Sequence, residues 1–268
     1  MKKGKVIAVM NRKGGVGKTT LTANLGAGLA RKGKKILLID ADGQGSLSGM
    51  LSKSEEIQAT TWDAMTSKNP GEGLKKRLPL FIAPSLALVC SDPRIDEIDT
   101  ALAGRYSRER ILRKIIREVY PDWTTQYDAI IIDCPPSAGL MTMNALTAAD
   151  LVLIPTLTEY MSLEGIGTMR SHIEEARDGG NPDLKLGGVV LMRFTTRTGN
   201  FKERNAISAE NALQEVFDGK LLETRIHRKK EIYDAPGAHK DIFSFAPGSR
   251  GASDFEALTE EIIRKFKL

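Results

Sequence analysis

Short apolar runs without polar alternation recur along the chain, and stretches with the apolar spacing of helices lie between several of them. The runs are rich in β-branched residues, which is typical of strands buried on both faces of a parallel sheet. This alternation predicts an α/β domain in which helices cover both faces of a mostly parallel, twisted sheet. The expected strands are Val6–Met10, Lys35–Ile39, Ala129–Ile132, Leu151–Ile154 and Gly188–Met192, and the expected helices are Thr20–Arg31, Arg105–Val119, Glu164–Arg177, Glu203–Phe217 and Asp254–Phe266.

Composition narrows the class of protein. The chain has 268 residues, of which 41% are hydrophobic and 27% charged, as in an ordinary globular protein. No apolar run approaches the roughly 18 residues that a membrane-spanning helix needs, and Val6–Met10 is too short for the core of a signal peptide. We therefore expect a cytoplasmic protein. Since no linker divides the sequence, we expect a single domain over residues 1–268, although residues 47–104 give no clear pattern.

A glycine-rich segment follows the first expected strand and opens the first expected helix. It matches the phosphate-loop pattern G-x-x-x-x-G-K-[ST] in a shifted form. Glycines let consecutive backbone N–H groups surround phosphate oxygens, and the N-terminus of the helix adds a favourable dipole. Lys18 is expected to reach the β and γ phosphates and Thr19 to ligate Mg²⁺. The predicted nucleotide-binding residues of this loop are Lys13, Gly14, Gly15, Val16, Gly17, Lys18, Thr19 and Thr20.

Carboxylates follow two further expected strands. Asp40 and Asp42 come after Lys35–Ile39, and Asp133 follows Ala129–Ile132. The carboxyl ends of strands form the edge of an open α/β sheet where ligands bind, and side chains two residues apart on an extended segment share a face. Asp133 is therefore expected to hold Mg²⁺, and the pair of acids to point at the phosphates. An ordinary capped turn after the strand would explain Asp42 alone better than it explains the pair.

The loop and the acids together resemble a known family. Lys13 to Thr20 reads Lys-Gly-Gly-Val-Gly-Lys-Thr-Thr, which resembles the deviant Walker A motif of the ParA/MinD ATPases. Asp-Ala-Asp-Gly-Gln-Gly from Asp40 and the Pro-Pro-Ser after Cys134 are similar to the two switch segments of that family. The similarity continues around Asn144 and is closest to the Soj/ParA branch, which lacks an extra N-terminal DNA-binding domain.

The resemblance implies a P-loop NTPase fold and an ATP-sandwich homodimer. Lys13 would cross the dimer interface to the nucleotide of the partner subunit, and would act in catalysis together with Lys18 and Asp42. Asp42 would orient the attacking water, so that the protein is expected to be a Mg²⁺-dependent ATPase with ATP and Mg²⁺ as cofactors.

The resemblance also assigns supporting residues. Asp40 would join Thr19 and Asp133 around the metal, and Asn144 would join the residues that bind the nucleotide. Gly43 stands where the family usually has proline, and this departure predicts a more mobile first switch.

A formal net charge of +5 and an isoelectric point near 9.1 permit a polyanionic partner. By resemblance, Arg197 aligns with a DNA-contacting arginine of the Soj branch, whereas Glu231 stands where a second such arginine is usual. Arg228, Lys229 and Lys230 are expected to replace it and to bind DNA phosphates without base readout. The resemblance thus implies a nucleoid-associated ATPase with a ParB-like partner that stimulates hydrolysis. Its role would be plasmid or chromosome partition or the positioning of another cargo, and the sequence leaves the cargo open.

Two other functions remain open at this point. A MinD-like ATPase that regulates the placement of cell division would bind membrane through a C-terminal amphipathic helix, and Leu258, Ile262, Ile263 and Phe266 do fall at helical spacing. The polar face of this segment is mixed in charge, however, so docking on the core is favoured and no membrane partner is expected.

The second alternative is an iron–sulfur protein related to the nitrogenase iron protein. It would need two cysteines as ligands, and the chain has only Cys90 and Cys134. Cys134 is flanked by the ParA-type Pro-Pro-Ser, and Cys90 ends an apolar run, so buried structural thiols are favoured over ligands. The histidines His172, His227 and His239 show no metal-binding spacing.

Overall fold

The computed structural model describes residues 3–68, 72–157, 163–194, 214–215, 217 and 219–268. An eight-stranded sheet with the strand order β3-β4-β2-β5-β1-β6-β7-β8 runs through them. Neighbouring strands are parallel except for the antiparallel pair β3 and β4, which confirms the prediction of a mostly parallel sheet. The strands are β1 (Lys5–Val9), β2 (Ile36–Asp40), β3 (Leu80–Ala83), β4 (Leu86–Val89), β5 (Ala129–Asp133), β6 (Leu151–Thr156), β7 (Lys185–Phe194) and β8 (Leu221–His227).

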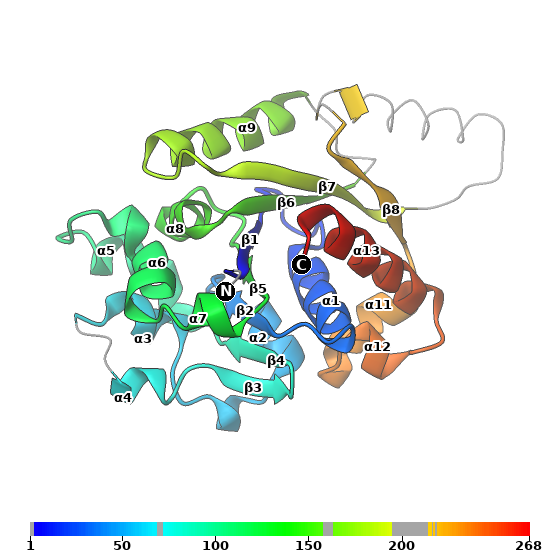
Figure 1. Cartoon of the computed structure of the whole chain (residues 1–268), viewed down its shortest axis with the longest axis horizontal. Coiled ribbons are helices and arrows are strands. Elements are labelled where there is room, and N and C mark those ends of the chain that lie inside the picture. Colours follow the sequence, from blue (N-terminus) through cyan, green and yellow to red (C-terminus); the bar gives the residue numbers. More distant parts are fainter. Residues whose placement is uncertain (1–2, 69–71, 158–162, 195–213, 216, 218) are drawn as a thin grey trace.

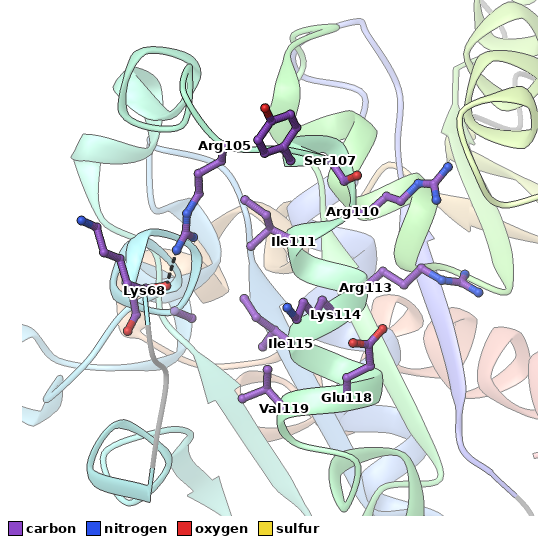
Figure 2. A pocket seen from close by; sticks show the side chains of 13 residues that line it. Lys68, Arg105, Ser107, Arg110, Ile111, Arg113, Lys114, Ile115, Glu118 and Val119 are labelled. Carbon is purple, nitrogen blue, oxygen red and sulfur yellow. Dashed lines mark hydrogen bonds between the residues drawn. The ribbon is translucent and has the colours of Figure 1, made fainter.

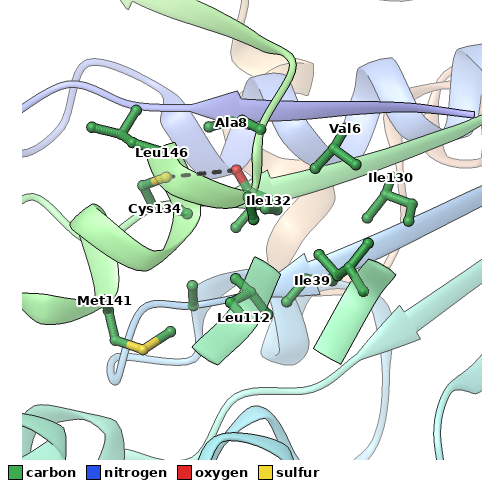
Figure 3. Close-up of a cluster of buried hydrophobic side chains, with 14 of the residues drawn as sticks. Val6, Ala8, Ile39, Leu112, Ile130, Ile132, Cys134, Met141 and Leu146 are labelled. Carbon is green, nitrogen blue, oxygen red and sulfur yellow. Dashed lines mark hydrogen bonds between the residues drawn. The ribbon is translucent and has the colours of Figure 1, made fainter. Parts of the chain in front are cut away.

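Helices cover both faces of this sheet (Figure 1). Successive side chains of a strand point to opposite faces, so β1 sends Val6 and Ala8 into one core and Ile7 and Val9 into the other. Figure 3 shows Val6 and Ala8 in the first core, which the helices α6, α8 and α9 cover. The helices α1, α12 and α13 cover the second core. The longer helices are α1 (Lys18–Arg31), α8 (Leu140–Ala148), α9 (Leu163–Asp178) and α13 (Arg250–Phe266), and the shorter ones are α2 (Ser46–Leu51), α3 (Thr61–Thr66), α4 (Glu72–Lys75), α5 (Ile98–Ala101), α6 (Ile111–Lys114), α7 (Trp123–Gln126), α11 (Lys230–Asp234) and α12 (Ile242–Phe245).

The C-terminal helix docks on the second core. It begins at Arg250, four residues before the expected start at Asp254, because the Ser249 hydroxyl accepts a hydrogen bond from the Ala252 amide at 3.1 Å and caps the helix. Leu258 and Ile262 are fully buried, which confirms the expectation that this apolar face packs on the core. In the part of the chain that the structure describes, no helix is both long enough and apolar enough to cross a membrane.

The strands β3 and β8 were not expected from the sequence, whereas β4 coincides with the apolar, strand-like run that ends at Cys90. β3 and β8 lie at the two edges of the sheet, where one side of a strand is open and polar residues are tolerated. The sequence of β8 therefore mixes buried Leu221 and Ile226 with exposed Glu223, and its charges obscure the pattern. The helix expected over Glu203–Phe217 falls almost entirely outside the described residues.

The helix expected over Arg105–Val119 is divided into three parts. A 3₁₀ turn (Arg108–Arg110) leads into α6, and a π-helical turn (Ile115–Val119) follows it. In a continuous α-helix the Leu112 amide would donate to the Arg108 carbonyl. Instead, the Asn144 side chain of α8 lies between them, accepting from the Leu112 amide at 3.0 Å and donating to the Arg108 carbonyl at 2.8 Å. A tertiary contact thus replaces a hydrogen bond of the helix.

Replacing Asn144 tests this role against the role in nucleotide binding that the resemblance implies. Asn144→Ala leaves the buried Leu112 amide and the partly buried Arg108 carbonyl without their partner, so we expect the free energy of unfolding to fall by about 2 kcal/mol. Urea unfolding measures this loss, with Gln126→Ala at an exposed position as a control that changes little. Nucleotide affinity should be unchanged, and a variant of normal stability that fails to bind nucleotide would contradict the structural role.

Candidate nucleotide-binding site

The glycine-rich loop joins the end of β1 to the start of α1, as expected. Gly15 and Gly17 have φ angles of +72° and +95°, a region that other residues adopt only under strain. A Cβ atom on Gly17 would also lie 3.0 Å from Cε of Met192 in β7. The base of the loop is held by Asn11, whose amide donates to the Pro155 carbonyl at 2.8 Å and whose side-chain oxygen accepts from the Lys13 amide at 2.9 Å.

Lys18, Thr19 and Asp133 meet at the start of α1. Val9 in β1 lies beside Asp133 at the end of β5, which brings this carboxylate to the glycine-rich loop. The Thr19 hydroxyl donates to Oδ2 of Asp133 at 2.7 Å, and the Thr22 hydroxyl lies 3.3 Å from Oδ1. Lys18 is only 8% exposed, and its Nζ lies 3.5 Å from the carbonyl oxygen of Lys13.

Burial dominates the electrostatics of this cluster. Desolvation, and after it the charge of the neighbouring Asp40, raise the pKa of Asp133 to about 8 against the opposing effects of the Thr19 hydrogen bond and the charge of Lys18. Burial also lowers the pKa of Lys18, although Asp133 and Asp42 partly offset this effect. The buried carboxylate is therefore short of positive charge, which a divalent cation would supply.

Asp40 organises the loop that carries Asp42. In the sheet Asp40 lies beside Asp133, and its Oδ2 accepts from the amide and the hydroxyl of Ser48 at 2.8 and 2.7 Å. Its Oδ1 accepts from the Asp42 amide at 3.2 Å. Burial raises the pKa of Asp40 to about 6. Both carboxylate oxygens are thus engaged in holding the loop, and a direct place for Asp40 in the metal shell stays a prediction.

Two serines, Ser48 and Ser91, complete this network, and the sequence analysis identified neither of them as a site residue. The Ser91 amide donates to the Ser48 hydroxyl oxygen at 2.8 Å, and the Ser91 hydroxyl donates to the Asp42 carbonyl at 2.6 Å. Ser48 lies on the short helix α2, and Ser91 lies just after β4. Both belong to the stretch 47–104 that gave no clear pattern, and a small hydroxyl residue after a buried strand is too common to mark a site by itself.

Gly43 has a specific neighbour in this fold. It is buried, and a Cβ atom at this position would lie 2.3 Å from Oδ1 of Asp96. The carboxylate of Asp96 thus occupies the space that a larger residue at position 43 would need. Where the resembled family usually has proline, the small Gly43 thus leaves room for the Asp96 side chain. The greater mobility of this segment stays a prediction.

Asn144 does not join the residues around the loop. It is fully buried, and besides Leu112 and Arg108 its side chain donates to the Leu140 carbonyl at 2.9 Å. The structure leaves it no exposed atom for a nucleotide, and it fixes α6 on α8 instead. The expectation that it contacts the nucleotide came from the motif around it, and the structure assigns this side chain a packing role.

The cysteines are buried on opposite faces of the sheet. Cys134 belongs to the first core and Cys90 to the second, and neither forms a disulfide. Burial raises the pKa of both thiols, so both disfavour the thiolate that binds metals. Among the described residues no group of three or more His, Cys, Asp or Glu side chains could hold a metal.

Strand β7 lies between the glycine-rich loop and the basic residues that are expected to contact DNA. Arg228, Lys229 and Lys230 are exposed and line a cavity of about 550 Å³ together with Arg193 and Tyr233. The Arg193 guanidinium lies 5.3 Å from the centre of the Tyr233 ring. Met192, adjacent to Arg193, is the residue that packs against Gly17. Arg197 lies outside the described residues.

Glu231 and His227, beside this basic surface, both contact residues near the start of α13. Oε1 of Glu231 accepts from the Gly251 amide at 3.4 Å, at the start of α13, where a negative charge is favourable. The ring of His227 contacts Oδ2 of the buried Asp254 at 2.8 Å, and Asp254 also accepts from Arg250 at 2.8 Å. His227 is therefore engaged in a structural contact with Asp254.

Comparisons with known proteins identify the family of this chain. Residues 4–186 match the family described as AAA domain. The chain is 35% identical over 266 residues to the chromosome partitioning protein ParA of Myxococcus xanthus, a match that covers 98% of this chain and 89% of that protein. It is also 35% identical over 260 residues to the sporulation initiation inhibitor protein Soj of Bacillus subtilis, covering 97% and 98% of the two chains.

A solved structure has the same fold. Cobyrinic acid a,c-diamide synthase from Mycobacterium smegmatis, with bound ATP analogue and magnesium, matches with a TM-score of 0.79 and 26% identity over 98% of this chain and 96% of that one. The phosphate loop, the acids at the sheet edge and the matches over nearly the whole length lead to one conclusion. The chain belongs to the ParA/Soj family of partition ATPases.

Proposed function

We propose that this protein is a Mg²⁺-dependent ATPase that forms an ATP-sandwich homodimer, binds DNA without sequence preference and drives the partition or positioning of a cargo. The observation that carries the proposal is the cluster of Lys18, Thr19 and Asp133 beneath a loop with two left-handed glycines. Binding of ATP analogue and magnesium by a structural relative supports the choice of ligands.

The residues fit a magnesium nucleotide. Oγ1 of Thr19 and Oδ2 of Asp133 lie 2.7 Å apart, and both are hard oxygen atoms of the kind that Mg²⁺ prefers. Mg²⁺ usually keeps waters and phosphate oxygens as its other ligands, so a larger set of protein carboxylates is not needed. A bound Mg²⁺ would neutralise phosphate charge. The loop amides and Lys18 would hold the β and γ phosphates.

Asp42 is the candidate for orienting the attacking water. It is partly exposed, and its Oδ1 accepts from the Gln44 amide at 3.1 Å, which fixes the carboxylate at the edge of the site. Ser91 and Asp40 hold its backbone from the other side. Phosphoryl transfer to water depends chiefly on such positioning and on charge stabilisation, and Asp42 would accept a proton of the water.

Lys13 is the candidate for contact across the dimer. It is exposed, in contrast to Lys18, although its backbone is fixed by Asn11. An exposed cation held at the mouth of a phosphate loop suits an interaction with the nucleotide of a second subunit, as the family resemblance implies. A dimer would bring the basic surfaces of both subunits to one duplex, and this would strengthen binding to DNA.

The basic surface, our candidate for DNA binding, adjoins the phosphate loop, which supports a response to the nucleotide. The end of β7 links them, since Met192 packs on Gly17 of the phosphate loop and Arg193 lies over Tyr233 in the basic surface. Exposed Arg228, Lys229 and Lys230 would contact phosphates, and a ParB-like partner would stimulate hydrolysis. The membrane-binding alternative has no support in the C-terminal helix, because its apolar face is buried in the second core.

Replacing Asp42 tests the catalytic assignment. Asp42→Ala removes the group that positions water but leaves the phosphate cradle, so we expect ATP to bind with nearly unchanged affinity while turnover falls at least about 100-fold. Phosphate release under saturating ATP measures turnover, and fluorescent-nucleotide titration measures binding. A variant that hydrolyses ATP at the wild-type rate would show that Asp42 is not the catalytic switch residue.

Replacing Lys13 tests the dimer. Lys13→Ala should reduce dimerisation with a nonhydrolysable ATP analogue, while Lys18 and the loop amides still bind the nucleotide. Light scattering measures the dimer, and Arg12→Ala, a neighbouring exposed cation, is the matched control. If the Lys13 variant dimerises as well as the control, the cross-interface role is wrong.

Charge reversal tests the DNA surface. Lys229→Glu should weaken binding to random-sequence DNA by about tenfold at moderate salt and reduce the slope of log affinity against log salt by about one. Glu231→Arg should tighten binding and steepen the slope, at some cost in stability because it removes the acceptor of the Gly251 amide.

The control for these variants is Lys185→Glu, an exposed lysine at the start of β7. Affinities are measured over a salt titration with ATP and with ADP. Equal affinity with both nucleotides would separate DNA binding from the dimer, and no response to either variant would place the DNA site elsewhere.

A further inference from the structure

A cavity of about 550 Å³ lies between the end of α3 and the face of α6, and it shares no lining residue with the nucleotide site or the basic surface. Figure 2 shows Ile111, Ile115 and Val119 along one wall. With the buried Ala64 they make an apolar floor. Lys68, Arg105 and Lys114 lie around this floor, and Glu118 is the acidic residue among the lining side chains.

Among the described residues, none of the cations that border the floor forms an ion pair with a carboxylate. The Arg105 guanidinium donates to the Met65 and Ser67 carbonyls at 3.2 and 2.9 Å, contacts that orient the group without neutralising its charge. Lys114 is exposed, and within the described ranges no carboxylate oxygen lies within 4 Å of its Nζ or of the Arg105 guanidinium. A positively charged border next to an apolar floor is complementary to an anion that also has an apolar part.

Other basic side chains near the cavity are directed elsewhere. Arg110 donates to the Gly179 carbonyl and Arg113 to the Thr147 carbonyl, at 2.9 and 3.0 Å. In Figure 2 both guanidinium groups point to the side of α6 opposite Lys68 and Arg105. The positive charge that borders the cavity therefore comes from Lys68, Arg105 and Lys114, and Glu118 adds one negative charge to the lining.

The wall of the cavity is fixed before any ligand binds. Asn144 holds the Arg108 and Leu112 backbone, and the Thr147 hydroxyl donates to the Glu109 carbonyl at 2.6 Å. Ile115 and Val119 stand on the π-helical turn, a rare conformation that occurs frequently at functional sites. A preformed cavity reduces the ordering cost of binding.

We propose that this cavity binds a small organic anion that has an apolar body and a single carboxylate or phosphate head. The volume lies within the range of roughly 300–1,000 Å³ typical of small-molecule sites. The apolar body covers the partly exposed Ile111 and Val119, with the buried Ile115 beneath them, and the head contacts Lys114 and Arg105. An inorganic ion would leave the apolar floor exposed, which disfavours it.

The probe for this site is 8-anilinonaphthalene-1-sulfonate, which combines an aromatic body with one anionic head. Its fluorescence is titrated with the full chain saturated with a nonhydrolysable ATP analogue and Mg²⁺, so that the phosphate loop is occupied. We expect saturable binding of one probe per chain. Lys114→Glu should weaken it at least tenfold, and Ile111→Glu should abolish it.

The matched control is Lys240→Glu, an exposed lysine outside the cavity, which should change the affinity less than twofold. Thermal unfolding and nucleotide binding verify that each variant is folded. Displacement of the probe by octanoate identifies a carboxylate ligand, and displacement by phenyl phosphate identifies a phosphate ligand. Unchanged binding in folded Lys114→Glu, or a probe that neither competitor displaces, would overturn the proposal.

Discussion

A buried carboxylate at the end of β5 is the constraint on which the site depends. Asp133 has no exposed surface of consequence, and the parallel register places it beside Val9 and Asp40 at the same edge of the sheet. Burying an ionised carboxylate is costly unless it is paired. The hydroxyls of Thr19 and Thr22 and the charge of Lys18 stabilise the ionised carboxylate, but they do not fully balance the cost of its burial. The pKa of Asp133 therefore rises to about 8. The fold thus buries this carboxyl group with too little positive charge nearby to keep it ionised, and a magnesium nucleotide would supply the missing charge.

The surrounding elements keep this carboxylate and its neighbours in place. The left-handed glycines of the phosphate loop shape the space above Asp133, and the network of Asp40, Ser48 and Ser91 holds the segment that carries Asp42. On the far side of the loop, β7 connects Gly17 to the basic surface through Met192. Nucleotide site and candidate DNA surface are therefore parts of one continuous packing arrangement, which supports coupling between them.

Much of this could be predicted from the sequence, because buried parallel strands and phosphate loops have strong local patterns. The strands β1, β2, β5, β6 and β7 and the positions of Lys18, Thr19 and Asp133 all follow from such patterns. The edge strand β8 could not be predicted in the same way, since its charges mask its alternation. Contacts between distant segments were also hidden: Asn144 interrupts a helix, and Ser91 holds the Asp42 loop, but neither residue type marks such a role in sequence.

Gly43 is an intermediate case. Its departure from the family's proline is visible in the sequence, but its neighbour is visible only in the fold, where the carboxylate of the exposed Asp96 lies in the space that a side chain at position 43 would enter. The role of residues 47–104 is likewise clear only in three dimensions. This stretch supplies α2, β4 and Ser91, which together hold the segment that carries Asp42.

The most direct test of the central claim is the thermal stability of Asp133→Asn against wild type. The folded-state pKa of Asp133 lies above its ordinary value of 3.8, so the folded state binds the proton more tightly and wild type loses stability as the pH rises from about 4 to 8. Without nucleotide at pH 8, the variant should therefore melt at a higher temperature than wild type. The expected shift is about 2–4 °C for each kcal/mol by which the free energy of unfolding of the variant exceeds that of wild type. Mg²⁺ and an ATP analogue should reverse this order by stabilising wild type far more. A variant that melts below wild type at pH 8 without ligand would contradict the account.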